Sequence, residues 1–221
     1  VHLAPTTLLA IENTHNSSGG RVFPLEQIDA ATSIARAAGL ATHLDGARLF
    51  NAEIASGVPA AAWASRFDTV ATCFSKGLGA PVGSALCGLR AVIDRARRLR
   101  KMLGGGMRQA GVLAAAAHFA LDHHIARLTE DHANARRLAE GLQKLGLPVD
   151  PEPETNMVIF RVADVLGFLR GAQQRGVLVL PLDGERFRAV THLDVGAADV
   201  DEALGRVAAL LDAQPALRPA A

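Results

Sequence analysis

The sequence predicts an α/β protein in which part of a large domain, built on a mainly parallel sheet, precedes a small C-terminal α+β domain. Three observations support this prediction. Apolar runs of strand length alternate with helical patterns over the first half of the chain. Asp45 and Lys76 each follow such a run, and about thirty residues separate them, the length of one βαβ unit. After Gly146 the order changes to β-α-β-β-α. We therefore place the large domain at residues 1–125 and the small domain at 126–221.

The first elements of the large domain are a strand, a loop and a helix. Residues 7–11 form a short apolar run, and the polar segment 12–20 that follows ends in two glycines. Pro24 then opens a helix, because proline suits the first helical position. Apolar residues recur in this segment at helical spacing, and Gly39 follows it as a C′ glycine would.

The remaining elements of the large domain alternate in the same way. Residues 40–44 form an apolar strand, and a helical stretch at 49–64 leads to the next strand at 69–74. Another short strand is predicted at 84–88. A strongly basic helix follows at 91–102. Its arginines suggest nucleic acid at first sight, but no aromatic platform accompanies them, so we interpret them as a solvated or interfacial helix face.

A long helical region at 108–145, broken or bent near His123 and His124, leads into the small domain. The elements expected in the small domain are strand 156–162, helix 163–176, strand 177–182, strand 186–193 and helix 197–211. The tail 215–221 is expected to fray.

The composition excludes several functional classes. Apolar residues make up 49% of the chain, which allows a substantial core, and the net charge of +1 gives no bulk attraction to nucleic acid or to a membrane surface. No apolar run reaches the ~18 residues of a membrane span. Cys73 and Cys87 lie in apolar runs and are interpreted as buried thiols of a reducing compartment. No metal-binding motif is present, and His123 and His124 would diverge on a helix, so we expect no metal site.

Lys76 is the first candidate for chemistry. It follows a strand and precedes Gly77, Gly79 and Gly83, which allow the backbone to turn away from the sheet. A lysine in such a place suits a Schiff base with an aldehyde cofactor, whereas an unaccompanied lysine is an ordinary surface residue. Asp45 favours the first interpretation, because both residues would lie at the carboxyl ends of parallel strands, where open α/β sheets bind ligands.

Asp45 is the second candidate. An aspartate at that edge can keep the ring nitrogen of pyridoxal phosphate protonated, and a protonated ring is an electron sink. The alternative role for Asp45 is a helix cap, since the segment from Asp45 to Arg48 is typical of a helix start.

Further basic residues are candidates for binding anions. Arg48 lies three residues after Asp45 and can pair with a substrate carboxylate, with the phenolic oxygen of the cofactor, or with a neighbouring acid. Arg188 lies in an apolar strand and needs an anion, either a substrate carboxylate or an internal aspartate. Lys101 and Arg108 flank three glycines, a junction that can hold a phosphate or carry charge across a subunit interface.

Six strings of the sequence combine these features: IENTHN at 11–16, HLDGARLFNA at 43–52, FSKGLGAPVGS at 74–84, RKMLGGGMRQ at 100–109, ARLTEDH at 126–132 and VTHLDV at 190–195. In this order, and over nearly the whole chain, they resemble the low-specificity L-threonine aldolases. These enzymes form part of the β-eliminating lyase group in the aspartate-aminotransferase-like superfamily, fold type I of the pyridoxal-phosphate-dependent transferases. Six ordered matches are far more specific than any single motif.

The resemblance implies the fold type I architecture and a role for each matching residue. Lys76 corresponds to the Schiff-base lysine and Asp45 to the partner of the pyridine nitrogen. Arg48 and Arg188 correspond to arginines near the substrate carboxylate, and His2 to a histidine near the substrate hydroxyl. The residues implied to bind the cofactor are Lys76, Asp45, Arg48, Ser75, Lys101 and Arg108, the last two from a neighbouring subunit.

The resemblance also implies an activity. Enzymes of this group use pyridoxal 5′-phosphate to cleave L-threonine, L-allo-threonine and related β-hydroxy-α-amino acids to glycine and an aldehyde. A cytoplasmic homotetramer with no nucleic-acid or membrane partner is expected. The alternatives are another fold type I enzyme, either an aminotransferase or a β-eliminating lyase, and an inactive truncated fragment. Family members carry a further N-terminal region with a phosphate-binding loop and a ring-stacking histidine. We therefore expect the chain starting at Val1 to bind cofactor poorly and to be inactive by itself.

Overall fold

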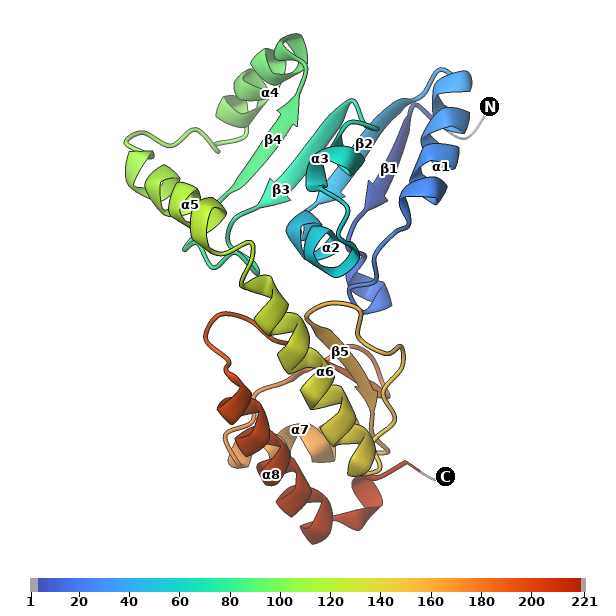
Figure 1. Ribbon diagram of the computed structural model, residues 1–221, viewed down its shortest axis with the longest axis vertical. Helices are drawn as coiled ribbons and strands as arrows, with labels where there is room; N and C mark the ends of the chain where they lie inside the picture. Colours follow the sequence, from blue (N-terminus) through green and yellow to red (C-terminus); the bar gives the residue numbers. More distant parts are fainter. Residues whose placement is uncertain (1–3, 220–221) are drawn as a thin grey trace. The chain divides into compact units, whose positions relative to one another are not determined.

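The structure is a computed structural model that describes residues 4–219. The described chain forms two compact units, each with its own sheet (Figure 1). The N-terminal unit ends at His15 and resumes from Val22 to Ala126. The C-terminal unit combines the short segment Asn16–Arg21 with the chain from Arg127 onward.

The N-terminal unit is built on a four-stranded sheet with the order β1-β2-β3-β4. Its strands are β1 (Leu8–Glu12), β2 (Ala41–Gly46), β3 (Thr69–Cys73) and β4 (Ser84–Gly88). The first three strands are parallel and β4 runs antiparallel to β3, which confirms the mainly parallel sheet. In the register of the sheet, Asp45 pairs with Glu12 on one side and with Ala71 on the other.

The helices of this unit follow the predicted pattern with one exception. They are α1 (Leu25–Ala37), α2 (Leu49–Ser56), α3 (Ala60–Ala64), α4 (Arg90–Met102) and α5 (Gly111–His123). The single helical stretch predicted at 49–64 is two helices. Gly57 adopts a left-handed conformation with φ of 73° that ends α2, and Pro59 is the N-cap of α3.

The core of the N-terminal unit lies on one face of the sheet. Ile11, Leu44 and Val70 are paired across the three parallel strands and pack with Ile28 of α1 and Trp63 of α3. Because side chains alternate along a strand, the neighbours of these residues project to the opposite face.

The C-terminal unit is an antiparallel sheet packed with helices. Its elements are α6 (Leu128–Lys144), β5 (Met157–Arg161), α7 (Val165–Gln174), β6 (Leu180–Pro181), β7 (Arg186–Val190) and α8 (Ala197–Ala213), with short 3-10 helices η1 (Asn16–Ser18) and η2 (Pro215–Leu217). The sheet order is β5-β7-β6. The predicted β-α-β-β-α order is therefore confirmed. The strand predicted at 177–182 is only two residues long, and Pro181, which has no N–H to donate, lies at the sheet edge.

Three phenylalanines form the centre of this second core. The rings of Phe160, Phe168 and Phe187 lie with centroids 5.1–5.6 Å apart. The described part of the tail, residues 215–219, also contributes, contrary to the prediction that it frays. Leu217 is 4% exposed within the core, and Arg218 Nε donates to the Leu145 carbonyl oxygen at 2.9 Å.

The prediction of two buried thiols is wrong for Cys87. Both cysteines are free, but Cys73 is half-buried and Cys87 is exposed. Cys87 lies on β4, the edge strand of the sheet.

Two helical glycines of the C-terminal unit should respond to alanine in opposite ways. At Gly171 of α7 an added Cβ would lie 2.4 Å from Cδ1 of Leu210, a fully buried side chain, whereas at Gly205 of α8 it would meet nothing within 4 Å. Gly171→Ala should therefore cost about 1–2 kcal/mol of unfolding free energy through overpacking. Gly205→Ala should gain up to about 1 kcal/mol from helix propensity. Urea unfolding followed by circular dichroism measures both, and equal stabilities of the two variants would contradict the packing argument.

The stability of the C-terminal unit should depend on pH through His132. Burial, with a smaller contribution from the Arg136 charge, lowers the pKa of His132 to about 4. The pKa of His132 in the folded state is below its value near 6.5 in the unfolded state. The neutral ring therefore makes its full contribution to the free energy of unfolding above pH 6.5. It should be lost as pH falls toward about 4, by up to roughly 3 kcal/mol. Burial raises the pKa of the adjacent Asp131, against the opposing effect of Arg127, so Asp131 changes stability in the opposite direction.

The comparison of wild type with His132→Gln isolates the histidine, because Asp131 is present in both. The difference in unfolding free energy between the two proteins should change between pH 6.5 and pH 4. A constant difference over that range would show that His132 is not the titrating group.

Candidate active site at the carboxyl edge of the parallel sheet

The carboxyl ends of β1, β2 and β3 meet at one edge of the N-terminal sheet, because the three strands are parallel and in register. Asp45 is the last residue but one of β2, and Lys76 lies three residues beyond the end of β3. Neighbouring strands in a sheet are about 4.8 Å apart. The fold therefore brings the two predicted residues to the same edge on adjacent strands.

Asp45 lies on the sheet face opposite the core and is exposed. Its Oδ1 accepts a hydrogen bond from the backbone N–H of Ala47 at 3.1 Å, so it closes the turn that leads into α2. The helix cap considered as its alternative role is wrong, because the N-cap residue of α2 is Arg48 and no side chain caps that helix. The second carboxylate oxygen has no hydrogen-bond partner among the described residues. Ala71, paired with Asp45 on β3, adds only a methyl group on this face.

Lys76 lies in a tight turn fixed by backbone hydrogen bonds. The N–H of Gly79 donates to the Lys76 carbonyl at 2.8 Å, and that of Ala80 donates to the Phe74 carbonyl at 2.9 Å. Gly79, with φ of 71°, adopts the left-handed conformation that the turn requires. Ser75 and Lys76 are both exposed, and the Lys76 amine has no partner within the described part of the chain.

Two more predicted residues, Arg48 and Lys101, lie at the ends of helices of the same unit. Arg48 is half-buried at the start of α2, three residues after Asp45. Lys101 is exposed in the last turn of α4. The neighbouring Arg100 lines a groove of about 370 Å³ with Ser84, the first residue of β4, which pairs with the last residue of β3. This groove therefore lies between α4 and β4.

The glycines after α4 leave room for this basic junction. A Cβ on Gly106 would lie only 2.8 Å from Cδ of Lys101, so the lysine side chain lies over the glycine. Arg108 follows two residues later and is exposed before α5 begins. His2, the remaining predicted site residue of this unit, lies outside the described residues.

Arg188 belongs to the C-terminal unit, in the middle of β7. Its Nη1 donates to Oδ1 of Asn16 at 2.9 Å, and its Nε is buried without a hydrogen-bond partner. No carboxylate of the described residues pairs with it. The anion that the sequence predicted for this arginine is therefore not supplied by an aspartate in the described chain.

The segment Asn16–Arg21 reaches Arg188 because it packs against the start of β5. Thr155 Oγ1 donates to the Gly20 carbonyl at 2.7 Å, and Arg21 pairs with Glu154 at 2.8 Å. Gly20 has φ of 76°, and a Cβ there would lie 2.5 Å from Thr155 Oγ1. Sequence reasoning assigned no role to Asn16, although Asn16 ends the string IENTHN at 11–16.

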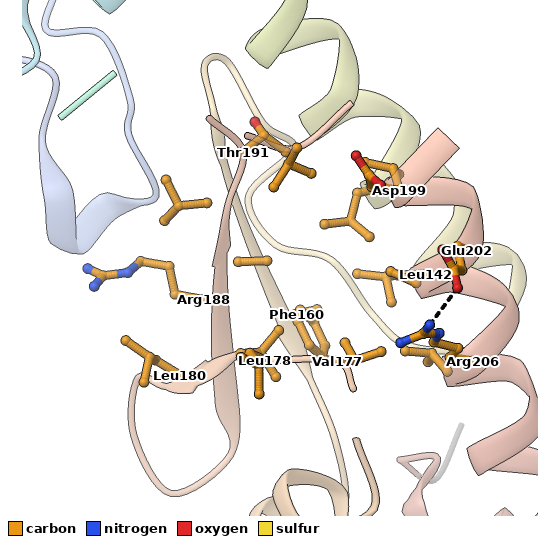
Figure 2. A pocket seen from close by; sticks show the side chains of 18 of the residues that line it. Leu142, Phe160, Val177, Leu178, Leu180, Arg188, Thr191, Asp199, Glu202 and Arg206 are labelled. Carbon is orange, nitrogen blue, oxygen red and sulfur yellow. Dashed lines mark hydrogen bonds and ion pairs between the residues drawn. The ribbon is translucent and has the colours of Figure 1, made fainter. Parts of the chain in front are cut away.

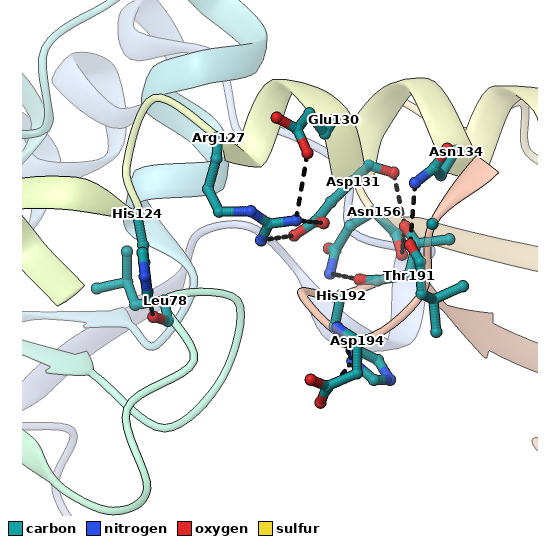
Figure 3. Close-up of polar contacts among 12 residues, drawn as sticks. Leu78, His124, Arg127, Glu130, Asp131, Asn134, Asn156, Thr191, His192 and Asp194 are labelled. Carbon is teal, nitrogen blue, oxygen red and sulfur yellow. Dashed lines mark hydrogen bonds and ion pairs between the residues drawn. The ribbon is translucent and has the colours of Figure 1, made fainter. Parts of the chain in front are cut away.

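A buried polar network fixes the end of β7 (Figure 3). Thr191 Oγ1 donates to the Asp131 carbonyl at 2.6 Å, and Asn156 Nδ2 donates to the Thr191 carbonyl at 2.9 Å. The Asp131 carboxylate pairs with Arg127 at 2.8 Å. Burial raises the pKa of Asp131 while the Arg127 hydrogen bond lowers it. We interpret the network as structural, since its charges are paired within the unit.

A cavity of about 480 Å³ lies elsewhere in the C-terminal unit (Figure 2). Its lining is mostly apolar, and two of its charged residues, Glu202 and Arg206, are paired with each other. Arg188 borders the cavity, but in Figure 2 its side chain points away from Phe160. Neither Asp45 nor Lys76 lines this cavity. We therefore place the candidate site at the carboxyl edge of the parallel sheet.

The residues at that edge fit pyridoxal phosphate by the chemistry of their side chains. Lys76 offers an amine without a partner in the described chain, and Asp45 offers a carboxylate oxygen in the same condition. Both are exposed, Asp45 near the end of β2 and Lys76 after the end of the adjacent strand β3. Within residues 4–219, no group of three or more His, Cys, Asp or Glu is placed to hold a metal ion. None of the helices described there is long and apolar enough to span a membrane.

Comparisons with known proteins agree with the resemblance. The family profile of the beta-eliminating lyases matches residues 1–165. The chain is 45% identical over 202 residues to low specificity L-threonine aldolase of Escherichia coli K12, and 42% identical over 202 residues to low-specificity L-threonine aldolase 1 of Arabidopsis thaliana. These alignments cover 91% and 88% of the chain. The chain spans only 60% and 56% of the length of these two relatives.

Solved structures show the same fold. Threonine aldolase of Leishmania major superposes with a TM-score of 0.78 at 21% identity, covering 96% of this chain and 62% of that one. Serine palmitoyltransferase of Sphingomonas wittichii superposes with a TM-score of 0.75 at 20% identity, covering 96% and 56%. The predicted fold type I architecture is confirmed. Since the profile covers residues 1–165 and curated relatives exceed 40% identity, the chain belongs to the beta-eliminating lyase family.

Proposed function

We propose that the protein is a pyridoxal-phosphate-dependent carbon–carbon lyase that cleaves β-hydroxy-α-amino acids, such as L-threonine and L-allo-threonine, to glycine and an aldehyde. The observation that carries this proposal is the position of Asp45 and Lys76 at the same edge of adjacent parallel strands. The identity to low-specificity L-threonine aldolases supports it, over the part of their length that the chain spans.

The proposed roles follow from the side chains. The Lys76 amine attaches the aldehyde of the cofactor, and the Asp45 carboxylate holds a proton on the ring nitrogen. Ser75, Arg48, Lys101 and Arg108 are proposed to contact the cofactor, the last two binding its phosphate from a neighbouring subunit. When bound, the cofactor supplies a protonated ring that accepts the electron pair released at Cα.

Arg188 and Arg48 are proposed to bind the substrate carboxylate. A guanidinium forms a strong, oriented pair with a carboxylate, and Arg188 has a buried Nε that no group of the described chain satisfies. An arginine that holds the carboxylate in place determines which bond to Cα lies perpendicular to the plane of the ring.

The proposed reaction is balanced in atoms and electrons. The β-hydroxyl loses its proton, the Cα–Cβ bond breaks, Cβ becomes the aldehyde carbon, and Cα gains a proton to give glycine. His2 is proposed to lie near the substrate hydroxyl.

Product analysis separates this proposal from other fold type I reactions. Equal amounts of glycine and acetaldehyde from L-threonine indicate aldol cleavage, whereas a keto acid indicates transamination or β-elimination. The measurement belongs in the longest natural protein that contains this chain.

We also propose a cytoplasmic location and a homotetramer, as the resemblance implies. The free cysteines are compatible with a reducing compartment. Large apolar side chains are exposed around the junction of α4 and α5, where Leu103 is 87% and Val112 82% exposed. An apolar surface of this kind is typical of a subunit interface. Sedimentation equilibrium measures the assembly directly.

Lys76 should be the amine that takes the cofactor. The chain has three lysines, Lys76, Lys101 and Lys144. After incubation with pyridoxal phosphate and reduction with borohydride, peptide mass mapping should find the phosphopyridoxyl group on Lys76. Lys76→Ala should remove the label and Lys144→Ala should not. Asp45→Asn, which keeps an oxygen for the Ala47 N–H but loses the charge, should weaken labelling of Lys76 alone. Preferential labelling of Lys101 or Lys144 would refute the assignment.

Arg188 should control substrate affinity. Arg188→Lys keeps the charge but loses the two-pronged geometry, and the loss of one charge-assisted hydrogen bond should raise KM for L-threonine about 10–100-fold. Arg186 on the same strand pairs with Asp183 at the surface, so Arg186→Lys is a matched control that should leave KM unchanged. Steady-state kinetics of the natural protein measure both. A KM for Arg188→Lys equal to that of the control would remove Arg188 from the site.

A further inference from the structure

A histidine outside the predicted site contacts the turn that carries Lys76. His124 lies immediately after α5, and its Nδ1 is 2.6 Å from the carbonyl oxygen of Leu78 (Figure 3). A carbonyl oxygen only accepts hydrogen bonds, so Nδ1 carries the proton and donates it. Both the neutral Nδ1–H tautomer and the imidazolium can make this bond.

Neighbouring groups hold His124 and Leu78 in the positions that this hydrogen bond requires. Leu78 is only 3% exposed, and the backbone N–H of His124 donates to the Ala120 carbonyl at 2.9 Å, which fixes the histidine at the end of α5. The Phe119 ring packs edge-on against the imidazole, with centroids 5.4 Å apart and an interplanar angle of 86°. A partly buried carbonyl that loses its donor has reduced access to water as a replacement.

The peptide group between Leu78 and Gly79 is held at both ends. Its carbonyl accepts from His124, and its N–H, on Gly79, donates to the Lys76 carbonyl at 2.8 Å. Rotation of this peptide would break both bonds together. His124 therefore reaches the backbone of Lys76 through a single rigid amide plane.

We propose that His124 is a positioning residue, which binds the Leu78 carbonyl and so holds the turn from Phe74 to Ala80 in the conformation that presents the Lys76 amine. The proposal rests on the proposed role of Lys76. His124 itself is proposed to contact neither the substrate nor the cofactor. Its effect passes through the backbone of the turn.

Amide hydrogen exchange in the 221-residue chain without cofactor tests the structural half of the proposal. His124→Leu removes the donor, whereas His124→Asn keeps an N–H group near the position of Nδ1. In His124→Leu the hydrogen-bonded amides of Gly79 and Ala80 should exchange at least about tenfold faster, and in His124→Asn they should stay within about threefold of wild type. Core amides of β2 should be unchanged in both, which separates a local effect from global unfolding.

His123 provides the matched control. It is exposed and also contacts the Phe119 ring, at 4.4 Å between centroids, but its neighbour His124 makes the bond to the turn. His123→Leu should leave the exchange of Gly79 and Ala80 at the wild-type rate. Unchanged exchange in His124→Leu, or equally fast exchange in His124→Leu and His124→Asn, would overturn the proposal.

The rate of borohydride-fixed labelling of Lys76 by pyridoxal phosphate tests the functional half. The rate should fall severalfold in His124→Leu and recover in His124→Asn, while labelling of Lys144 stays constant. Equal labelling of Lys76 in all variants would overturn the positioning role. If Lys76 is not labelled even in wild type, the proposed function fails, and the exchange experiment still decides whether His124 holds the turn.

Discussion

The parallel pairing of β1, β2 and β3 is the constraint on which the candidate site depends. It brings three strand ends to one edge, and its register places Asp45 opposite Ala71, on the face away from the core. A slip by one residue would turn Asp45 toward Ile28 and Trp63, where an unpaired carboxylate is costly, and would turn Leu44 to the exposed face. The same burial that stabilises this unit therefore determines where the carboxylate projects.

Local patterns in the sequence were sufficient to predict the strands and the edge that Asp45 and Lys76 share. Apolar runs and glycines mark strand ends without knowledge of distant contacts, and the identities of Asp45 and Lys76 suggested the chemistry. The break between α2 and α3 was visible in principle at Gly57 and Pro59, but the apolar residues on both sides concealed it. Short-range periodicity does not resolve two helices that are separated by three residues.

Other features were out of reach because they depend on contacts between distant residues. Asn16 binds Arg188 across 172 positions of the chain, and His124 binds Leu78 across 46. No periodicity encodes such pairs. The contrast between Arg188 and Asp131 shows what the structure adds. Both are charged groups of the C-terminal unit, but Asp131 is paired with Arg127, whereas Arg188 has an amide partner and a buried, unsatisfied Nε. A guanidinium with a buried N–H that lacks an acceptor destabilises the protein when no ligand is bound. An anionic ligand can supply the missing acceptor.

The backbone sets the conformation of the Lys76 turn, because the lysine side chain forms no hydrogen bond or ion pair with the described residues. Lys76 is exposed, and its amine has no partner among the described residues. A lysine side chain carries about 2 kcal/mol of rotamer entropy, so no intrinsic preference points it toward Asp45. The position of its Cα is better determined. Gly79 allows the reversal of the chain, two backbone hydrogen bonds close it, and His124 holds the intervening peptide plane from outside. Because the backbone of the turn is already ordered, only the four rotatable bonds of the Lys76 side chain remain free. Attachment to a cofactor would fix these bonds as well.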